Sequence, residues 1–235
     1  MFQFKEFSIN QDKSAMKIGT DGVLLGAWCP IDNNPKSVLD IGTGTGIIAL
    51  MMAQRTSANQ IDALEIDENA FEQATDNFEN SPWADKLFCY HAGLDEFVDE
   101  PEDEYDLIIS NPPFFLEDFK STDQARNLAR FVDAMPFEEV IEAADLLLSE
   151  NGIFAVIIPH KEENNFLSLA AEYELYPIKI TRVRGTFKTP IIRSLLAFKR
   201  FEMPILVADE LVIEIERHVY TDDYIDLVKD FYLKM

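Results

Sequence analysis

Cysteine and histidine are scarce in this chain of 235 residues, which has two of the first and three of the second. Cys29 and Cys89 are far apart and form no CxxC unit, so they are expected to be reduced core residues. His91, His160 and His218 are equally scattered. None of these residues has the spacing of metal ligands, so the sequence predicts neither a structural zinc nor a histidine-based metal centre.

Long apolar runs are also missing from the sequence. No apolar stretch approaches the roughly 20 residues that a membrane-spanning helix needs. The N-terminal segment MFQFKEFSIN alternates apolar and polar residues and lacks the apolar region of a signal peptide. We therefore expect no membrane contact and a cytoplasmic location. The composition, 47% hydrophobic with 18 Phe, is ample for a packed core.

Basic residues are outnumbered, since 20 Lys and Arg against 43 Asp and Glu give a formal net charge of −23. They are nevertheless clustered: the stretch from Lys179 to Arg200 has seven basic residues and no acid. One interpretation is an acidic, solubilising surface with incidental basic strands. We favour a local basic footprint for nucleic acid. The candidate RNA contacts from this reasoning are Lys120, Arg126, Arg130, Arg184, Lys188 and Arg193.

Short apolar runs alternate with helical patterns along most of the chain. The runs expected to be strands are residues 37–41, 61–66, 87–91, 105–110 and 153–159. The helices are expected at about 47–54, 68–79 and 137–148. This order predicts an α/β fold with a mostly parallel sheet and helices on both faces. Residues 178–183 and 194–199 then add an antiparallel pair, which gives seven strands.

A glycine-rich segment, DIGTGTG at residues 40–46, joins the first of these strands to a helix. Glycines let the backbone turn sharply and approach a ligand, and the following helix offers free N–H groups. The DxGxGxG spacing resembles the first motif of Rossmann-like methyltransferases, whose ligand is S-adenosylmethionine. An ordinary glycine turn or a dinucleotide site is the alternative. The candidate cofactor contacts are Asp40, Gly42, Thr43, Gly44 and Gly46.

Two further acids follow later strands. Glu65 ends the second strand, where a carboxylate can accept hydrogen bonds from both ribose hydroxyls. Asp67 is a competitor, although we expect it to cap the next helix. After the third strand, Gly93 takes the position at which methyltransferases often carry an acid for the adenine amino group. Asp95 is the candidate adenine contact there, and a helix-capping role is the alternative.

The motif Asn111-Pro112-Pro113-Phe114 comes directly after the fourth strand and resembles the [DNS]PP[YFW] signature of methyltransferases that act on planar amino nitrogens. The lone pair of such an amine is delocalised into its ring. The Asn111 side-chain oxygen and the Pro112 carbonyl can accept hydrogen bonds from the amine and orient its lone pair. Phe114 supplies a face for stacking. We predict Asn111, Pro112 and Phe114 as catalytic residues.

Taken together, the chain resembles the bacterial tRNA(Val) (adenine-37-N6)-methyltransferases, within the Rossmann-like class I methyltransferases. The segments that carry the resemblance are residues 4–12, 15–28, 81–84, 108–114, 129–130 and 231–235. The resemblance implies S-adenosylmethionine as cofactor, N6 of adenine 37 in a valine tRNA as methyl acceptor, and neither a metal nor a membrane partner. It also implies that Lys17 and the turn at residues 19–22 close the pocket, unless Lys17 is a solvated surface lysine.

We expect a single, monomeric methyltransferase domain over residues 1–235. Residues 1–30 would extend over the cofactor site, residues 31–200 would form the core, and residues 201–235 would be an addition. Methylation of guanine N2 in rRNA, of adenine N6 in DNA, or of a protein glutamine is an alternative activity. A non-catalytic protein that binds the cofactor or RNA is the alternative from another class.

Overall fold

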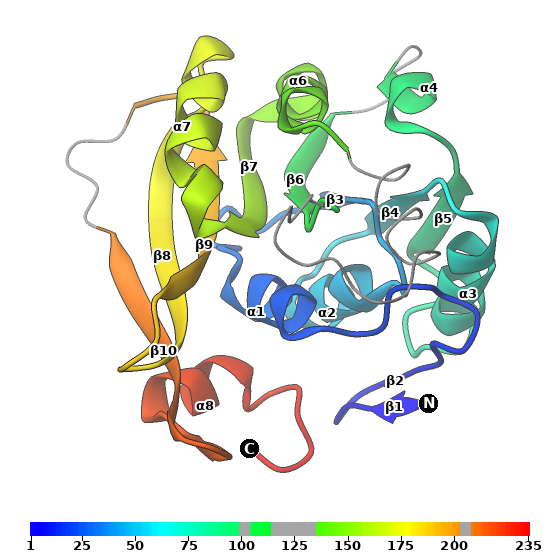
Figure 1. Cartoon of the computed structure of the whole chain (residues 1–235). Coiled ribbons are helices and arrows are strands. Elements are labelled where there is room, and N and C mark those ends of the chain that lie inside the picture. Colours follow the sequence, from blue (N-terminus) through cyan, green and yellow to red (C-terminus); the bar gives the residue numbers. More distant parts are fainter. Residues whose placement is uncertain (99–103, 114–134, 203–207) are drawn as a thin grey trace.

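The computed structural model describes residues 1–98, 104–113, 135–202 and 208–235. The strands of its main sheet are β3 (Ser37–Ile41), β4 (Gln60–Glu65), β5 (Leu87–His91), β6 (Tyr105–Ser110), β7 (Leu148–Pro159), β8 (Tyr176–Thr186), β9 (Ile191–Lys199), β10 (Asp209–Glu216) and β11 (Val219–Tyr220). They are ordered β11-β10-β8-β9-β7-β6-β3-β4-β5 across the sheet (Figure 1). A separate small sheet pairs β1 (Phe2–Gln3) with β2 (Ser8–Ile9).

Helices cover both faces of the main sheet. One layer contains α1 (Thr20–Trp28), α2 (Ile47–Arg55), α3 (Glu68–Glu79) and α8 (Asp222–Val228). The other contains α4 (Leu94–Val98), α6 (Phe137–Leu147) and α7 (Glu163–Glu172), the last of which follows a short 3₁₀ turn at His160–Glu162. Along β7, Ile157 packs in the first layer and Ile158 in the second, and both are fully buried. Burial on both faces explains the continuous apolar runs of the sequence.

The strand directions confirm a mostly parallel sheet with an antiparallel strand in its C-terminal part. β3 runs parallel to β4 and β6, β4 to β5, and β6 to β7. β9 lies between β7 and β8 and is antiparallel to both. β8 therefore runs in the same direction as β7, so the turn between β8 and β9 lies beyond the carboxyl ends of the parallel strands.

The sheet is larger than the seven strands expected, since the described residues place nine strands in it. The additional strands come from the segment after residue 200: β10 pairs in parallel with β8, and β11 pairs antiparallel with β10. In the sequence of β10, DELVIEIE, only Leu211 and Val212 are buried. Its four acids weaken the apolar pattern by which strands are recognised, which is why the sequence did not indicate this strand.

The N-terminal residues contact both helix α3 and the C-terminal segment of the chain. The backbone N–H of Asn10 donates to Asn77 Oδ1 at 2.9 Å, and the backbone N–H of Lys5 donates to the Phe231 carbonyl at 2.8 Å. Both termini accordingly lie on the same side of the molecule (Figure 1). The N-terminal extension is thereby placed over α3, next to the segment that joins β3 to α2.

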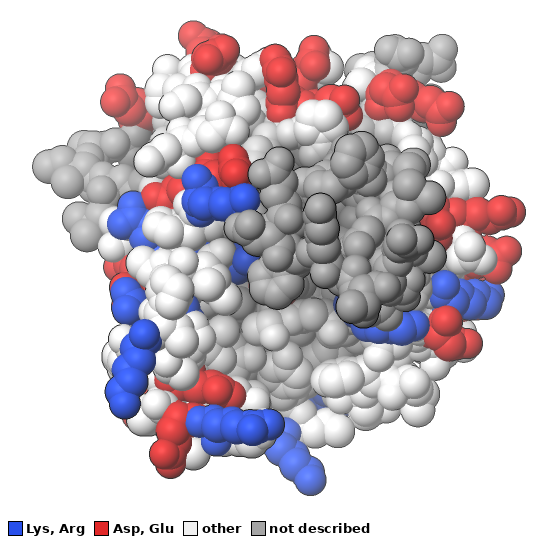
Figure 2. Space-filling model, viewed as in Figure 1, with Lys and Arg blue, Asp and Glu red and all other residues white. Residues whose placement is uncertain are grey.

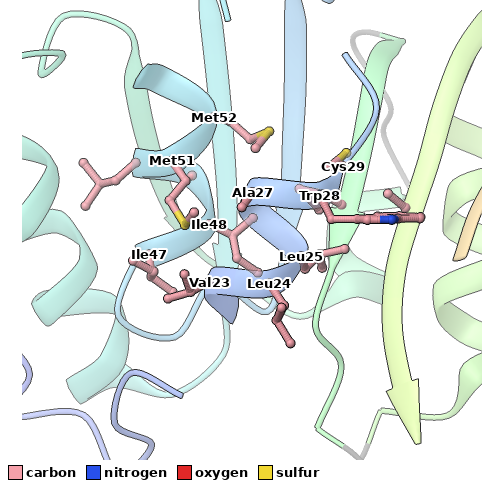
Figure 3. Packing of buried hydrophobic residues seen from close by; sticks show 14 of the residues in the cluster. Val23, Leu24, Leu25, Ala27, Trp28, Cys29, Ile47, Ile48, Met51 and Met52 are labelled. Carbon is pink, nitrogen blue, oxygen red and sulfur yellow. The ribbon is translucent and has the colours of Figure 1, made fainter. Parts of the chain in front are cut away.

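Close packing of α1 against α2 fixes the position of that segment. In Figure 3, apolar side chains of α1 interdigitate with those of α2, and nearly all of them are fully buried. A Cβ on Gly26 would stand 2.6 Å from Met51 Sδ, so the Met51 side chain would have to move to admit a larger residue there. Trp28 Nε1 donates to Thr181 Oγ1 at 2.8 Å, which ties α1 to β8. The prediction of a turn at residues 19–22 is wrong for residues 20–22, because helix α1 begins at Thr20.

Candidate active site

The glycine-rich segment forms an open loop between β3 and α2. Gly42, Gly44 and Gly46 have φ angles of 72°, 59° and 81°, in the left-handed region that favours glycine. Nothing lies within 4 Å of where a Cβ would be on Gly42 or Gly44, whereas a Cβ on Gly46 would meet Phe78 at 2.5 Å. The loop therefore presents bare backbone to open space on one side and packs tightly against α3 on the other.

The buried side chain of Asp40 stabilises this loop through hydrogen bonds. Its Oδ2 accepts hydrogen bonds from Thr43 Oγ1 at 2.6 Å and from the backbone N–H of Ala49 at 3.1 Å. The carboxyl group thus caps the first turn of α2, and Asp40 and Thr43 are both buried. Asp40 Oδ1 is buried without a hydrogen-bond partner among the described residues. Burial raises the pKa of Asp40 to about 7, against the lowering effect of these two hydrogen bonds.

The raised pKa of Asp40 makes the stability of the protein depend on pH. An aspartate in an unfolded chain has a pKa of about 3.9, so between that pH and about 7 the folded state keeps a proton that the unfolded chain has released. We expect the free energy of unfolding to fall as pH rises across this window, by about 1.4 kcal/mol for each unit by which the two pKa values differ. Urea unfolding at several pH values measures this slope.

Asp40→Asn should flatten that pH dependence, because the amide oxygen can keep both hydrogen bonds and carries no titrating proton. The exposed residue Asp85 provides the control. Asp85→Asn should leave the slope as it is in the wild type. An Asp40→Asn protein with the wild-type slope would contradict the assignment of the titration to Asp40.

Glu65 ends β4 beside the glycine loop. Its Oε2 accepts from the Gly44 backbone N–H at 2.8 Å and its Oε1 from the Asp67 backbone N–H at 2.9 Å. Burial raises the pKa of Glu65. The expected helix cap is confirmed, since Asp67 Oδ1 accepts from the Ala70 backbone N–H at 2.8 Å at the start of α3. Each carboxylate oxygen of Glu65 retains a free lone pair for a further donor.

An apolar surface next to Glu65 was not anticipated from the sequence. Ile66 follows β4 and is 64% exposed, although the sequence pattern places it within the strand. His91 pairs in register with Glu65, and its ring stacks on Phe71 with centroids 5.1 Å apart. The signal in the sequence is an isoleucine directly after a strand-end acid, and its exposure is seen in the structure.

The Asn-Pro-Pro motif lies beside the glycine loop. Ser110 ends β6 opposite Ile41, the last residue of β3, and Ser110 Oγ donates to the Ile41 carbonyl at 2.9 Å. Asn111 and Gly42 are the next residues of the two strands, so the motif and the loop start side by side. Asn111 is half-buried and Pro112 is buried. Phe114 lies outside the described residues.

The structure places Asp95 at the start of a helix. Asp95 is in the first turn of α4, where the Gly93 carbonyl accepts from the backbone N–H of Phe97 at 3.2 Å. A Cβ on Gly93 would stand 2.5 Å from Asp95 Oδ1. The carboxylate therefore folds back over the start of α4, and glycine at position 93 makes room for it.

The basic stretch between Lys179 and Arg200 is largely neutralised by acids from elsewhere in the chain. Arg193 Nε lies 2.8 Å from Asp21 Oδ2, and Arg184 Nη2 lies 2.7 Å from Glu210 Oε2. Arg182 and Arg200 also form ion pairs, with Glu163 and Asp145. The local basic footprint expected from the sequence stays a prediction for this stretch, in which all four arginines are paired with acids. Figure 2 shows acidic side chains along the top of the view, around α4, α6 and α7, and basic side chains mixed with further acidic ones lower, towards β8 and β10.

The remaining candidate RNA contacts differ in their surroundings. Lys17 Nζ donates to the carbonyls of Gln11 and Ser14, so it holds the N-terminal extension in shape. Lys188 is exposed in the turn between β8 and β9. Lys120, Arg126 and Arg130 lie outside the described residues.

Two further features concern partners other than RNA. Among the described residues, no His, Cys, Asp and Glu side chains gather in threes as a metal ion would need. No helix in the same part of the chain has the length and apolar character to cross a bilayer.

Comparisons with solved structures agree with this architecture. A predicted O-methyltransferase from Agrobacterium tumefaciens aligns with a TM-score of 0.69 at 17% identity, covering 90% of this chain and 96% of that one. TrmK of M. capricolum, solved in complex with the cofactor product S-adenosyl-homocysteine, aligns with a TM-score of 0.55 at 12% identity, covering 81% and 73%. At these identities the likeness establishes the fold, that of the class I methyltransferases.

Sequence comparisons are closer. The Methyltransferase small domain family matches residues 23–174, more than half of the chain. A tRNA1(Val) (adenine(37)-N6)-methyltransferase of Flavobacterium johnsoniae is 72% identical over 235 residues, with both chains covered completely. The protein of the same description from Bacteroides fragilis is 43% identical over 235 residues, covering all of this chain and 98% of its own. The chain therefore belongs to the tRNA1(Val) (adenine(37)-N6)-methyltransferase family.

Proposed function

We propose that this protein transfers a methyl group from S-adenosylmethionine to N6 of adenine 37 in a valine tRNA. The observation that carries the proposal is the placement of Asn111-Pro112 beside the glycine loop, at the ends of the neighbouring strands β6 and β3. A cofactor-binding loop and a group that holds an amine must adjoin for methyl transfer to occur. Full-length relatives of this family support the choice of adenine in tRNA as the acceptor.

The residues around the loop fit S-adenosylmethionine. The bare backbone at Gly42 and Gly44 leaves room for a ligand to approach, and Glu65 offers carboxylate oxygens to the ribose hydroxyls. Exposed Ile66 offers an apolar face to the adenine ring. The cofactor supplies an electrophilic methyl group on a sulfonium, a leaving group that needs no further activation. Asp40 and Thr43 shape the loop from inside.

Asn111 and Pro112 act on the acceptor amine. The Asn111 side-chain oxygen and the Pro112 carbonyl accept hydrogen bonds from its two N–H groups, which would direct the nitrogen lone pair at the methyl group. The methylated amine then loses one of these protons to water. Proline at 112 fixes the backbone and so the direction of its carbonyl. In the proposal, Phe114 stacks on the target base, which an RNA loop releases at modest energetic cost.

The remaining residue roles are proposals of the same kind. Asp95 serves as the adenine contact only if its carboxylate swings away from Gly93. Lys17, Lys120, Arg126 and Arg130 are proposed to contact RNA. Arg184, Lys188 and Arg193 are proposed to do so as well, and the two arginines would exchange a carboxylate partner for phosphate. We further propose that the protein works as a monomer in the cytoplasm, where tRNA is available.

The test is methyl transfer from labelled S-adenosylmethionine to unmodified bulk tRNA, followed by nucleoside analysis. We expect label in N6-methyladenosine, and in valine tRNA when isolated species are compared. Parallel reactions with rRNA, duplex DNA and protein extract test the alternative substrates. Label in one of these, with none in tRNA, would overturn the proposed substrate while leaving the cofactor assignment intact.

A further inference from the structure

The turn between β8 and β9 exposes apolar side chains that the catalytic site does not use. Phe187 is 64% exposed and Ile192 is 47% exposed, and Lys188 between them is exposed as well. Within the described ranges, Lys188 takes part in no ion pair, unlike the arginines of the adjoining strands. A bulky aromatic side chain held out in solvent next to an unpaired cation is a combination that indicates a binding surface.

Hydrogen bonds within the turn hold the backbone around Phe187 in place. The backbone N–H of Thr186 donates to Thr189 Oγ1 at 2.9 Å, and the backbone N–H of Thr189 donates to the Thr186 carbonyl at 3.1 Å. Arg184, itself fixed by Glu210, donates to the Phe187 carbonyl at 3.5 Å. A turn closed in this way loses little backbone freedom when it binds a partner, which favours its use as a contact.

Strand register places this turn beyond the carboxyl ends of β6 and β7, the side of the sheet on which the candidate site lies. Ser110 at the end of β6 lies level with Val156 of β7, which lies level with Leu196 of β9. Ile191, where β9 begins, is five residues further out, roughly 16 Å at about 3.3 Å per residue. In Figure 1 the yellow turn accordingly reaches well below the ends of β6 and β7. That distance corresponds to roughly five stacked nucleotides at about 3.4 Å each.

The charge of the turn selects the kind of partner. The protein has a formal net charge of −23, yet no Asp or Glu occurs between residues 175 and 201. Acids from other segments pair with the neighbouring Arg184 and Arg193, so among the described residues the exposed cation that stays available to a phosphate in this turn is Lys188. Single-stranded nucleic acid is recognised by aromatic faces that stack on bases and by cations that contact the backbone. Phe187 and Lys188 supply one of each, side by side.

We propose that the β8–β9 turn is a second RNA contact, in which Phe187 stacks on an unpaired base of the anticodon loop and Lys188 contacts an adjoining phosphate. The base lies roughly five nucleotides from the methylated adenine, which occupies the catalytic site. The proposal rests on tRNA being the substrate. Its role is recognition: the turn holds the loop while Asn111 and Pro112 act on the target amine.

The experiment compares Phe187→Ala with Phe201→Ala. Phe201 is a matched control, since it is 42% exposed, follows the other end of β9, and has Lys199 Nζ 5.6 Å from its ring centroid. Loss of one stacked base weakens RNA binding by about 5- to 150-fold. We expect Phe187→Ala to raise the KM for unmodified valine tRNA by such a factor, with kcat and the Kd for S-adenosylhomocysteine unchanged. Phe201→Ala should match the wild type.

Phe187→Trp keeps an aromatic face, so its KM for unmodified valine tRNA should match that of the wild type. Stacking should quench the fluorescence of the introduced tryptophan when an unmodified anticodon stem-loop is added to this variant. A wild-type KM for Phe187→Ala, or an equal rise for Phe201→Ala, overturns the proposal. A change in the oligomeric state of Phe187→Ala in sedimentation, without a change in its KM, also overturns the proposal. The turn would then contact a second copy of the chain. A wild-type protein that leaves tRNA unmethylated is the separate outcome that rejects the proposed function.

Discussion

Replacing Asn111 with alanine is expected to lower kcat by about 100- to 1,000-fold, the range found when one polar group that acts on a transition state is removed. The side chain is half-buried at the end of β6, next to the start of the glycine loop. Alanine removes the oxygen that accepts from the amine and leaves the Pro112 carbonyl as the remaining acceptor. Single-turnover methylation of tRNA measures the effect on the chemical step.

Cofactor binding should be preserved in that variant, because among the described residues none of the loop's hydrogen bonds involves Asn111. Calorimetric titration with S-adenosylhomocysteine tests this directly. Asn111→Asp keeps an acceptor oxygen and should retain more activity than the alanine variant. Asn165→Ala, on the exposed side of α7, is the control and should behave as the wild type. Loss of cofactor binding in Asn111→Ala would falsify the assigned role.

The cofactor side of the site could be anticipated because it is encoded locally. Gly42, Gly44 and Gly46 all have positive φ angles, as the spacing of the motif requires, and Asp67 caps α3 as its position predicts. In these cases the residue and the structure that it determines lie within a few positions of each other. The parallel sheet is anticipated for the same reason, since each buried strand reads as a continuous apolar run.

Contacts between distant segments could not be read in the same way. The hydrogen bond from Ser110 to Ile41, which sets the Asn-Pro-Pro motif against the loop, joins residues 69 positions apart. Arg193 pairs with Asp21 across 172 positions, so part of the positive charge of a basic stretch is neutralised in space. Register and side-chain direction decide such pairings, and both emerge only when the sheet is assembled.

Replacing Glu65 with alanine is expected to weaken binding of S-adenosylhomocysteine by about 100-fold or more. Two hydrogen bonds to a charged group are lost, each worth about 1.5 to 3 kcal/mol. The Gly44 backbone N–H also loses its acceptor, which loosens the loop at the point where the ligand approaches. Calorimetric titration measures the affinity. Glu65→Gln keeps the shape and an acceptor oxygen, so its loss should be smaller.

The pH dependence of binding separates a ribose contact from a merely structural role. Burial raises the pKa of Glu65, and the protonated acid accepts hydrogen bonds poorly. Affinity should therefore fall as pH is lowered, beginning at a higher pH than for an ordinary glutamate. Glu65→Gln should lack this fall, whereas Glu68→Gln, at an exposed position of α3, should keep it. If Glu65→Gln bound with the wild-type affinity and pH profile, Glu65 would serve only to hold the Gly44 backbone.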